Sequence, residues 1–219
     1  MELKYKKVNI DEWKRKEHFS VYRNQTKCGF SLTVKLKIAS VVRFVKANEY
    51  KFYPVMIYLI TKVVNRYQEF RMALKDDDLI IWDEVIPVYT VLHKESETFS
   101  ALFTTETSTF DKFLASYDEV VEKHRGNFSF LPEKPPANHF NISAIPWIFF
   151  DSFNLNIADF TDYFTPSFTI GKYQQEGEEI VLPVAVQVHH ATCDGIHVAK
   201  LIETLQDYCN DIEKEDVFQ

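Results

Sequence analysis

The fold of this protein is decided by one stretch of sequence, Val184-Ala185-Val186-Gln187-Val188-His189-His190-Ala191-Thr192-Cys193-Asp194-Gly195. Its valines alternate with other residues, which predicts an extended strand whose side chains point to alternating faces. That period places His190 on the valine face and His189 on the opposite face. Asp194-Gly195 is a turn signal, and apolar residues then recur at helical spacing from Ile196 to Leu205. The stretch therefore predicts a buried strand, a sharp turn and a helix.

His190 stands at the end of the predicted strand, beside the turn. A strand fixes an imidazole ring while the adjacent loop leaves room for a substrate, so this position suits a general base. A core histidine bonded only to backbone is the commoner alternative for a lone residue of this type. A metal site is a further alternative, but the opposed faces of the two adjacent histidines disfavour it. Its ligands would come from His189, His190, Cys193, Asp194 and His197.

Length and composition favour one domain over residues 1–219, long enough to bury a full core. The net charge is −7 and the basic residues are scattered, which argues against nucleic acid as a partner. The 19 Phe, 11 Tyr and 3 Trp residues suggest an aromatic-lined pocket or an aromatic interface. Three cysteines without a close pair (Cys28, Cys193 and Cys209) fit free thiols in a reducing cytoplasm.

No segment of the sequence predicts a membrane anchor. Residues 1–13 mix charges of both signs and lack the apolar core of a signal peptide. The longest apolar runs, such as Tyr53 to Ile60, fall well short of the roughly 20 residues that span a bilayer. We expect a soluble cytoplasmic protein without a membrane partner.

Hydrophobic periodicity predicts three or four helices among many strands. The helices are expected at residues 11–22, 53–67, 110–121 and 196–205. The strands are expected at residues 30–38, 72–74, 79–82, 88–93, 98–103, 140–150, 164–174 and 180–190. The four strands between 72 and 103 would form an antiparallel meander, and the last two strands a hairpin. The predicted fold class is α+β, a two-layer sandwich of helices on a large mixed, mostly antiparallel sheet.

The motif His189-His190-Ala191-Thr192-Cys193-Asp194-Gly195 matches the HHxxxDG signature of acyl-CoA-dependent acyltransferases. Dihydrolipoyl acyltransferases and the condensation domains of peptide synthetases also carry this signature. Nearly the whole chain, however, resembles the chloramphenicol acetyltransferase family in its trimeric type. The segments that carry the resemblance are Cys28–Thr33, Tyr50–Tyr58, Asn141–Trp147, Phe150–Asn156 and Asp159–Phe164.

The resemblance implies a bacterial antibiotic-resistance enzyme that uses acetyl-CoA as co-substrate and binds no cofactor or metal. It would transfer the acetyl group directly to the 3-hydroxyl of chloramphenicol in a ternary complex. His190 would be the general base through Nε2, Ser143 would donate to the oxyanion, and Thr169 would support the oxyanion through water. A neutral imidazole can take the hydroxyl proton and later return it to the departing thiolate.

The resemblance also assigns residues around this centre. Asp194 would pair with Arg15 and hold the turn in shape, and a bond from Nδ1 of His190 to its own carbonyl would orient the ring. The implied chloramphenicol-binding residues are Tyr22, Phe30 and Phe99, and the implied CoA-binding residues are Trp147, Lys172 and Tyr173. Ser167 departs from the family pattern, which is often aliphatic there, and this leaves the fine substrate preference open.

A homotrimer with active sites at the subunit boundaries is a further implication, with His190 of one chain facing a pocket built largely by the next. Two other functions stay open. The first is an acyltransferase of the same fold with another acceptor, such as dihydrolipoamide, which the lack of a lipoyl or carrier domain disfavours. The second is a non-catalytic protein that sequesters a ligand, which the intact set of His190, Ser143, Asp194 and Arg15 disfavours.

Overall fold

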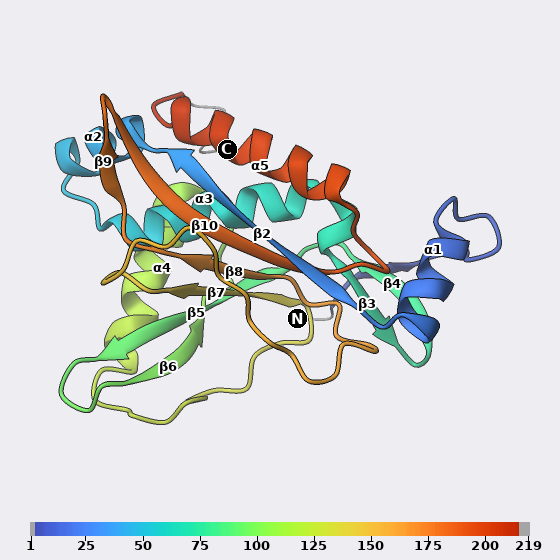
Figure 1. Ribbon diagram of the computed structural model, residues 1–219. Helices are drawn as coiled ribbons and strands as arrows, with labels where there is room; N and C mark the ends of the chain where they lie inside the picture. Colours follow the sequence, from blue (N-terminus) through green and yellow to red (C-terminus); the bar gives the residue numbers. More distant parts are fainter. Residues whose placement is uncertain (1–2, 215–219) are drawn as a thin grey trace.

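The structure is a computed structural model that describes residues 3–214, and a seven-stranded sheet forms its centre (Figure 1). The strand order is β2-β10-β8-β7-β5-β6, with β9 paired to β10 beside β8. The pairs β5–β7 and β7–β8 are parallel, and the other pairs of this sheet are antiparallel. The predicted mixed, mostly antiparallel sheet is therefore confirmed. Its strands are β2 (Gly29–Lys37), β5 (Ile86–His93), β6 (Thr98–Phe103), β7 (His139–Ala144), β8 (Ser167–Ile170), β9 (Gln174–Glu176) and β10 (Glu179–His189).

A second sheet of three strands has the order β1-β4-β3, with β1 at Tyr5–Lys7, β3 at Met72–Lys75 and β4 at Asp78–Trp82. The predicted meander is therefore wrong, because β3 and β4 lie in this small sheet while β5 and β6 lie in the large one. The break falls at Val85, whose backbone N–H and carbonyl both bond to the side chain of Asn65, each at 2.8 Å. This side chain takes the place of a strand partner and directs the chain from one sheet to the other.

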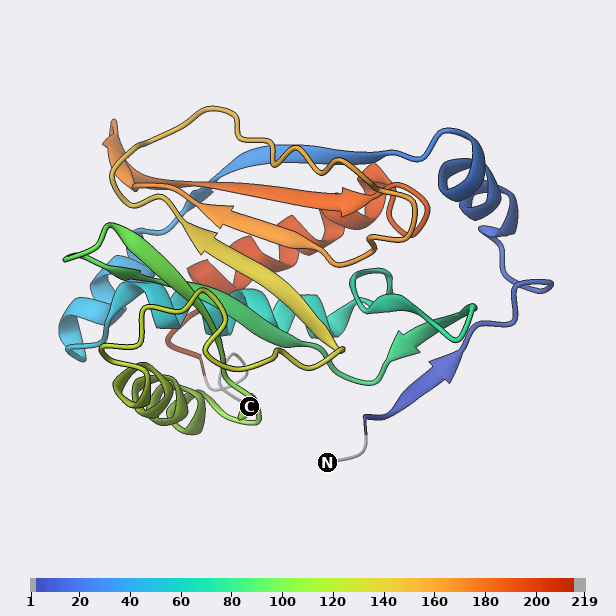
Figure 2. The ribbon, with the colours of Figure 1, turned by 90° about the horizontal axis from the view of Figure 1, so that it is seen from below.

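Helices cover one face of the large sheet, as Figure 2 shows for α3 and α5. Those two helices pack against each other, and the valines of β10 share one hydrophobic core with Leu201 and Leu205 of α5. Burying this layer supplies most of the driving force for folding, since free energy falls by about 25 cal/mol per Å² of apolar surface removed from water. The bounds are α2 (Ala39–Ala47), α3 (Phe52–Arg66), α4 (Phe110–Lys123) and α5 (Gly195–Asn210).

The structure corrects several predicted boundaries. The N-terminal helix starts later than predicted, with α1 at Lys16–Ser20 and the π-helix η1 at Val21–Gln25. Helix α2 was not predicted, because its β-branched residues also suit a strand. The predicted strand at 140–150 ends at Ala144, two residues before Pro146, which has no N–H to continue the ladder. The predicted strand at 164–174 is reduced to β8, and the predicted hairpin is formed by β9 and β10 around Gly177, whose φ is +61°.

The other face of the large sheet is polar and is covered by an irregular segment, residues 145–166. Two side chains of the sheet bond to the backbone of this segment, and Asn141 donates to the hydroxyl of Tyr163 at 3.0 Å. Thr33 accepts a bond from the backbone N–H of Phe153 at 3.2 Å, and Gln187 accepts one from that of Leu155 at 2.9 Å. Aligned across the sheet on this face are Ser31, Gln187, Ser167 and Asn141, and in the next row Thr33, Ala185, Thr169 and Ser143.

Within residues 3–214, no helix combines the length and the apolar character that a bilayer crossing would need.

Candidate active site

The predicted strand, turn and helix around His190 are present. Strand β10 ends at His189, α5 begins at Gly195, and Asp194 is the extended N-cap of that helix. The turn is closed by backbone bonds to the His189 carbonyl, from Thr192 at 3.2 Å and from Cys193 at 3.0 Å. The N–H of His190 donates to the carbonyl of Cys28 at 3.0 Å, which ties the turn to the start of β2.

The His190 ring is held by two oxygen atoms and two aromatic rings. Its Nδ1 lies 3.1 Å from the Cys193 carbonyl and 3.2 Å from Oδ1 of Asp194, rather than bonding to its own carbonyl as the resemblance implied. Because both neighbours are acceptors, the proton of the neutral ring belongs on Nδ1 and the lone pair on Nε2. Tyr22 stacks on the ring at 3.8 Å between centroids, and Phe30 meets it edge-on at 5.1 Å.

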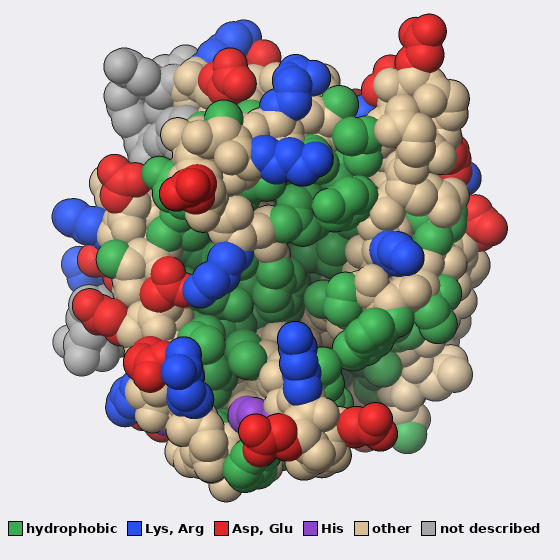
Figure 3. All heavy atoms as spheres, turned by 90° about the vertical axis from the view of Figure 1, so that its left-hand side faces the viewer, with side chains coloured by type: hydrophobic (Ala, Val, Ile, Leu, Met, Phe, Trp, Pro, Cys, Tyr) green, Lys and Arg blue, Asp and Glu red, His purple; other side chains and the backbone are tan. Residues whose placement is uncertain are grey.

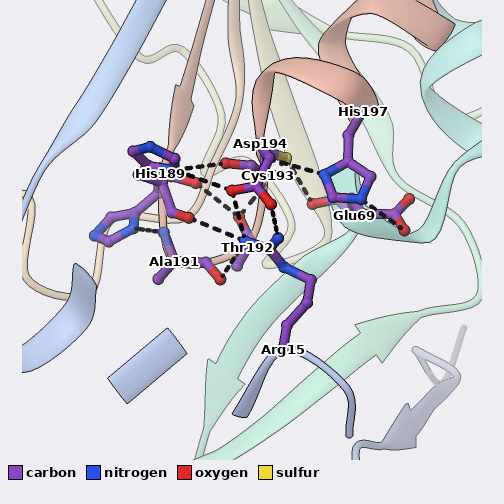
Figure 4. A network of polar contacts seen from close by, with 9 residues as sticks. Arg15, Glu69, His189, Ala191, Thr192, Cys193, Asp194 and His197 are labelled. Carbon is purple, nitrogen blue, oxygen red and sulfur yellow. Dashed lines mark hydrogen bonds and ion pairs between the residues drawn. The ribbon is translucent and has the colours of Figure 1, made fainter. Parts of the chain in front are cut away.

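Arg15 holds the turn from the N-terminal side (Figure 4). Its Nη1 pairs with Oδ2 of Asp194, and its Nη2 lies 3.1 Å from Oδ1. The same Nη2 donates to the carbonyls of His190 at 3.2 Å and Ala191 at 3.4 Å. Burial raises the pKa of the Asp194 carboxyl, but the Arg15 guanidinium outweighs it, so that pKa lies below its usual value. The carboxyl is therefore ionised and paired at neutral pH.

His189 has different surroundings from its neighbour. Its ring is buried against Phe160 and Phe164, and its Nδ1 accepts from the N–H of Ala191 at 2.9 Å. Burial lowers the pKa of this imidazole. Among residues 3–214, no group of three or more His, Cys, Asp or Glu side chains could hold a metal ion.

A largely apolar cavity of about 840 Å³ opens at the other end of the sheet. Figure 3 shows the hydrophobic hollow on this side of the molecule. Ser143 lies on its wall, with Oγ 3.0 Å from the hydroxyl of buried Thr169 on the adjacent strand. Four of the predicted binding residues also line the cavity, namely Phe99, Trp147, Lys172 and Tyr173.

The structure does not bring all the predicted site residues together in one chain. Ser143 pairs with Thr169, and Thr169 pairs with Ala185 of β10. His190 lies five residues further along the chain than Ala185, or about 17 Å at 3.4 Å per residue. One end of the sheet therefore carries Arg15, Tyr22, Phe30, His190 and Asp194, and the other carries Phe99, Ser143, Trp147, Thr169, Lys172 and Tyr173.

Two residues beside the turn were not predicted as part of the catalytic site, although His197 was named as a ligand of the disfavoured metal site. His197, on the first turn of α5, accepts from the backbone N–H of Asp194 with Nδ1 at 2.8 Å. Its Nε2 lies 3.9 Å from Oε1 of Glu69, in the short helix η2 (Gln68–Phe70). The spacing Asp194-x-x-His197 is that of a capping box, with His in place of Glu or Gln, and could have revealed His197. Nothing in the local sequence points to Glu69.

Comparisons with known proteins relate the whole chain to one family. The family model described as chloramphenicol acetyltransferase matches residues 3–206. Chloramphenicol acetyltransferase 3 of Escherichia coli is 52% identical over 209 residues, which cover 95% of this chain and 98% of that protein. Chloramphenicol acetyltransferase 2 of Haemophilus influenzae is 51% identical over 213 residues, which cover 97% of this chain and 100% of that protein.

A solved structure of a chloramphenicol acetyltransferase aligns with a TM-score of 0.84 at 20% identity, covering 94% of this chain and 100% of that one. At that identity the structural match supports the fold alone. The sequence matches extend over nearly the whole chain at about half identity, which establishes common descent. This chain therefore belongs to the chloramphenicol acetyltransferase family.

Proposed function

We propose that this protein transfers the acetyl group of acetyl-CoA to the 3-hydroxyl of chloramphenicol. The observation that carries the proposal is the surroundings of Nδ1 of His190, which lies 3.1 Å from the Cys193 carbonyl and 3.2 Å from Oδ1 of Asp194. Two oxygen acceptors at Nδ1 leave the lone pair on Nε2, which is the state a general base requires. A protein that only sequesters a ligand has no need of such a base.

The chemistry is a direct transfer. Nε2 of His190 removes the hydroxyl proton as that oxygen attacks the thioester carbonyl, and a tetrahedral oxyanion forms. Ser143 donates a hydrogen bond to this oxyanion, and Thr169, 3.0 Å from Ser143, supports it through water. Collapse of the intermediate breaks the carbon–sulfur bond, and the imidazolium returns its proton to the CoA thiolate.

A second copy of the chain completes the site in this proposal. The base and the oxyanion donors of one chain are separated by about 17 Å along β10, too far apart for both to act on one reacting carbonyl. A head-to-tail ring would place the His190 end of each chain against the cavity end of the next, as in the trimer that the family resemblance implies. We therefore propose a homotrimer with its sites between subunits. Exposed apolar side chains at the cavity end, including Phe99, Trp147 and Ile148, support such a contact.

The cavity suits the two substrates. Acetyl-CoA would lie along Trp147, Lys172 and Tyr173, where exposed aromatic rings can stack on a base and an ammonium can pair with phosphate. Chloramphenicol would lie between Phe99 of one chain and Tyr22 and Phe30 of the next. Three free cysteines fit the bacterial cytoplasm as the location of the reaction.

The test measures CoA thiol released from acetyl-CoA by the purified protein, with and without chloramphenicol. We expect chloramphenicol-dependent release that falls by about 10²–10⁴-fold in His190→Ala. No release with chloramphenicol, but release with dihydrolipoamide, would refute the proposed acceptor and leave a different acyltransferase. Full activity in His190→Ala would refute the assignment of the base.

A further inference from the structure

One peptide group lies between the general base and a second histidine, His197, which is labelled in Figure 4. The carbonyl of Cys193 lies 3.1 Å from Nδ1 of His190. The N–H of the same peptide unit, which belongs to Asp194, donates to Nδ1 of His197 at 2.8 Å. The two imidazole rings are thus bonded to opposite sides of the Cys193–Asp194 peptide, although they lie on different elements.

The bond to His197 requires one particular tautomer. Nδ1 can accept only if it carries no proton, so the proton of the neutral His197 ring is on Nε2. That nitrogen faces Oε1 of Glu69 at 3.9 Å, and both side chains are largely shielded from solvent, at 19% and 17% exposure. Glu69 is also linked to the turn by its own carbonyl, which accepts from Sγ of Cys193 at 3.4 Å.

We propose that His197 is a positioning residue for His190 that acts through the Cys193–Asp194 peptide, and that Glu69 fixes the tautomer of His197. With its N–H bonded, this peptide cannot rotate, so its carbonyl stays directed at Nδ1 of His190. The bond also polarises the peptide and makes the carbonyl a stronger acceptor, which favours the imidazolium formed during the reaction. Arg15 bonds to the carboxylate of Asp194 and to the carbonyls of His190 and Ala191, whereas His197 bonds to the N–H of the Cys193–Asp194 peptide.

The surroundings of His197 keep its ring neutral, so that Nδ1 can accept the hydrogen bond from Asp194. Burial lowers the pKa of this imidazole; Glu69 and Asp194 act to raise it, and Arg15 and Lys200 act to lower it. The net shift is downward, so the ring is neutral at neutral pH. In acid the ring would take a proton on Nδ1 and release the peptide.

Two substitutions separate the two bonds of His197. In His197→Asn the amide oxygen takes the place of Nδ1 and can still accept from Asp194, but the side chain is too short to reach Glu69. In His197→Leu an apolar side chain remains, but it has neither an acceptor for Asp194 nor a polar group for Glu69, so comparison with His197→Asn isolates the bond from Asp194. Thermal unfolding checks that both variants are folded.

We expect His197→Leu to lower kcat by up to about 10²-fold with KM for both substrates nearly unchanged, since a misplaced catalytic group can lose this much rate. His197→Asn should keep kcat within about a factor of three of the wild type. Equal kcat in the two variants, or a lower kcat in His197→Asn, would overturn the proposal.

The inference rests on the proposed role of His190 as base, and a second readout separates the two. Nitrogen NMR shifts of the imidazole rings report which nitrogen of His190 carries the proton, without any turnover. We expect the Nδ1–H tautomer in the wild type and in His197→Asn, and a mixture of tautomers in His197→Leu. If His190→Ala stays active, the proposed base is wrong while the tautomer result still stands. An unchanged tautomer in His197→Leu refutes the positioning role itself.

Discussion

Mixing two inactive variants tests the separation of the base from the oxyanion donor. His190→Ala removes the base from one end of the chain, and Ser143→Ala removes the hydroxyl from the other, about 17 Å away along β10. Alone, the first variant should lose about 10²–10⁴-fold and the second about 10²–10³-fold in rate. If each site takes His190 from one chain and Ser143 from the next, a mixed ring contains some sites in which both groups are intact.

The activity expected from the mixture follows from the fraction of sites in which both groups are intact. In an equal mixture assembled at random, the chance that a site has an intact base is one half, and the chance of an intact hydroxyl is also one half. About one quarter of the sites are then complete, and the mixture should show about one quarter of the wild-type rate. This is at least an order of magnitude above either variant alone, because each retains about a hundredth of the rate or less.

The assay denatures the two variants together, refolds them and measures chloramphenicol-dependent release of CoA thiol. Each variant refolded alone and the double variant His190→Ala/Ser143→Ala refolded with wild type provide controls for refolding. A mixture no more active than the mean of its components would show that the site is complete within one chain, and would refute the reasoning from the strand register.

Three further predictions concern single residues. Asp194→Asn should lower stability by about 2 kcal/mol and lower kcat with it, measured by urea unfolding and initial rates; an equally stable variant without activity would contradict the structural role. Arg15 lowers the pKa of Asp194 in the folded protein, so the ion pair stabilises the fold at pH values above the pKa of Asp194 in the unfolded chain. This stabilisation is lost as the pH falls through the pKa of Asp194 in the folded protein. Wild type should therefore lose more stability in acid than Asp194→Asn does. Trp147→Ala should raise KM for acetyl-CoA by about tenfold with kcat little changed, since stacking contributes about 1–3 kcal/mol; an unchanged KM would exclude the contact. Leu201→Ala should destabilise the core by about 2–5 kcal/mol in urea unfolding, whereas a loss under 1 kcal/mol would show that the α5 interface repacks.

Local sequence signals accounted for the elements around His190, because alternation and helical spacing are properties of neighbouring residues. The turn from Asp194 to Gly195 and the helix after it are of this kind. Helix α2 was not predicted, because Val41, Val42 and Val45 suit a strand as well as a helix. The assignment of β4 and β5 to different sheets was not predicted either. It depends on the side chain of Asn65, which lies 20 residues before Val85 in the sequence.

The candidate site shows the same division between local and distant information. The resemblance identified the residue types, but only the pairing of β7, β8 and β10 places Ser143 and His190 at opposite ends of the sheet. The ion pair of Arg15 with Asp194 joins residues 179 positions apart, and no periodicity reveals it. Glu69 is still harder to predict from the sequence, because it contacts His197 from η2 and belongs to no motif.

The segment at residues 145–166 has a consequence for how this enzyme can evolve. Bonds to the side chains of Thr33 and Gln187 hold its middle to the sheet, and backbone bonds from Lys172 to Ile148 and from Asn141 to Pro166 hold its two ends. Substitutions there leave the strand pairing of the sheet intact, yet Phe153 contributes to the cavity wall. Changes in acceptor preference can therefore accumulate in this segment under selection while the catalytic framework is inherited unchanged.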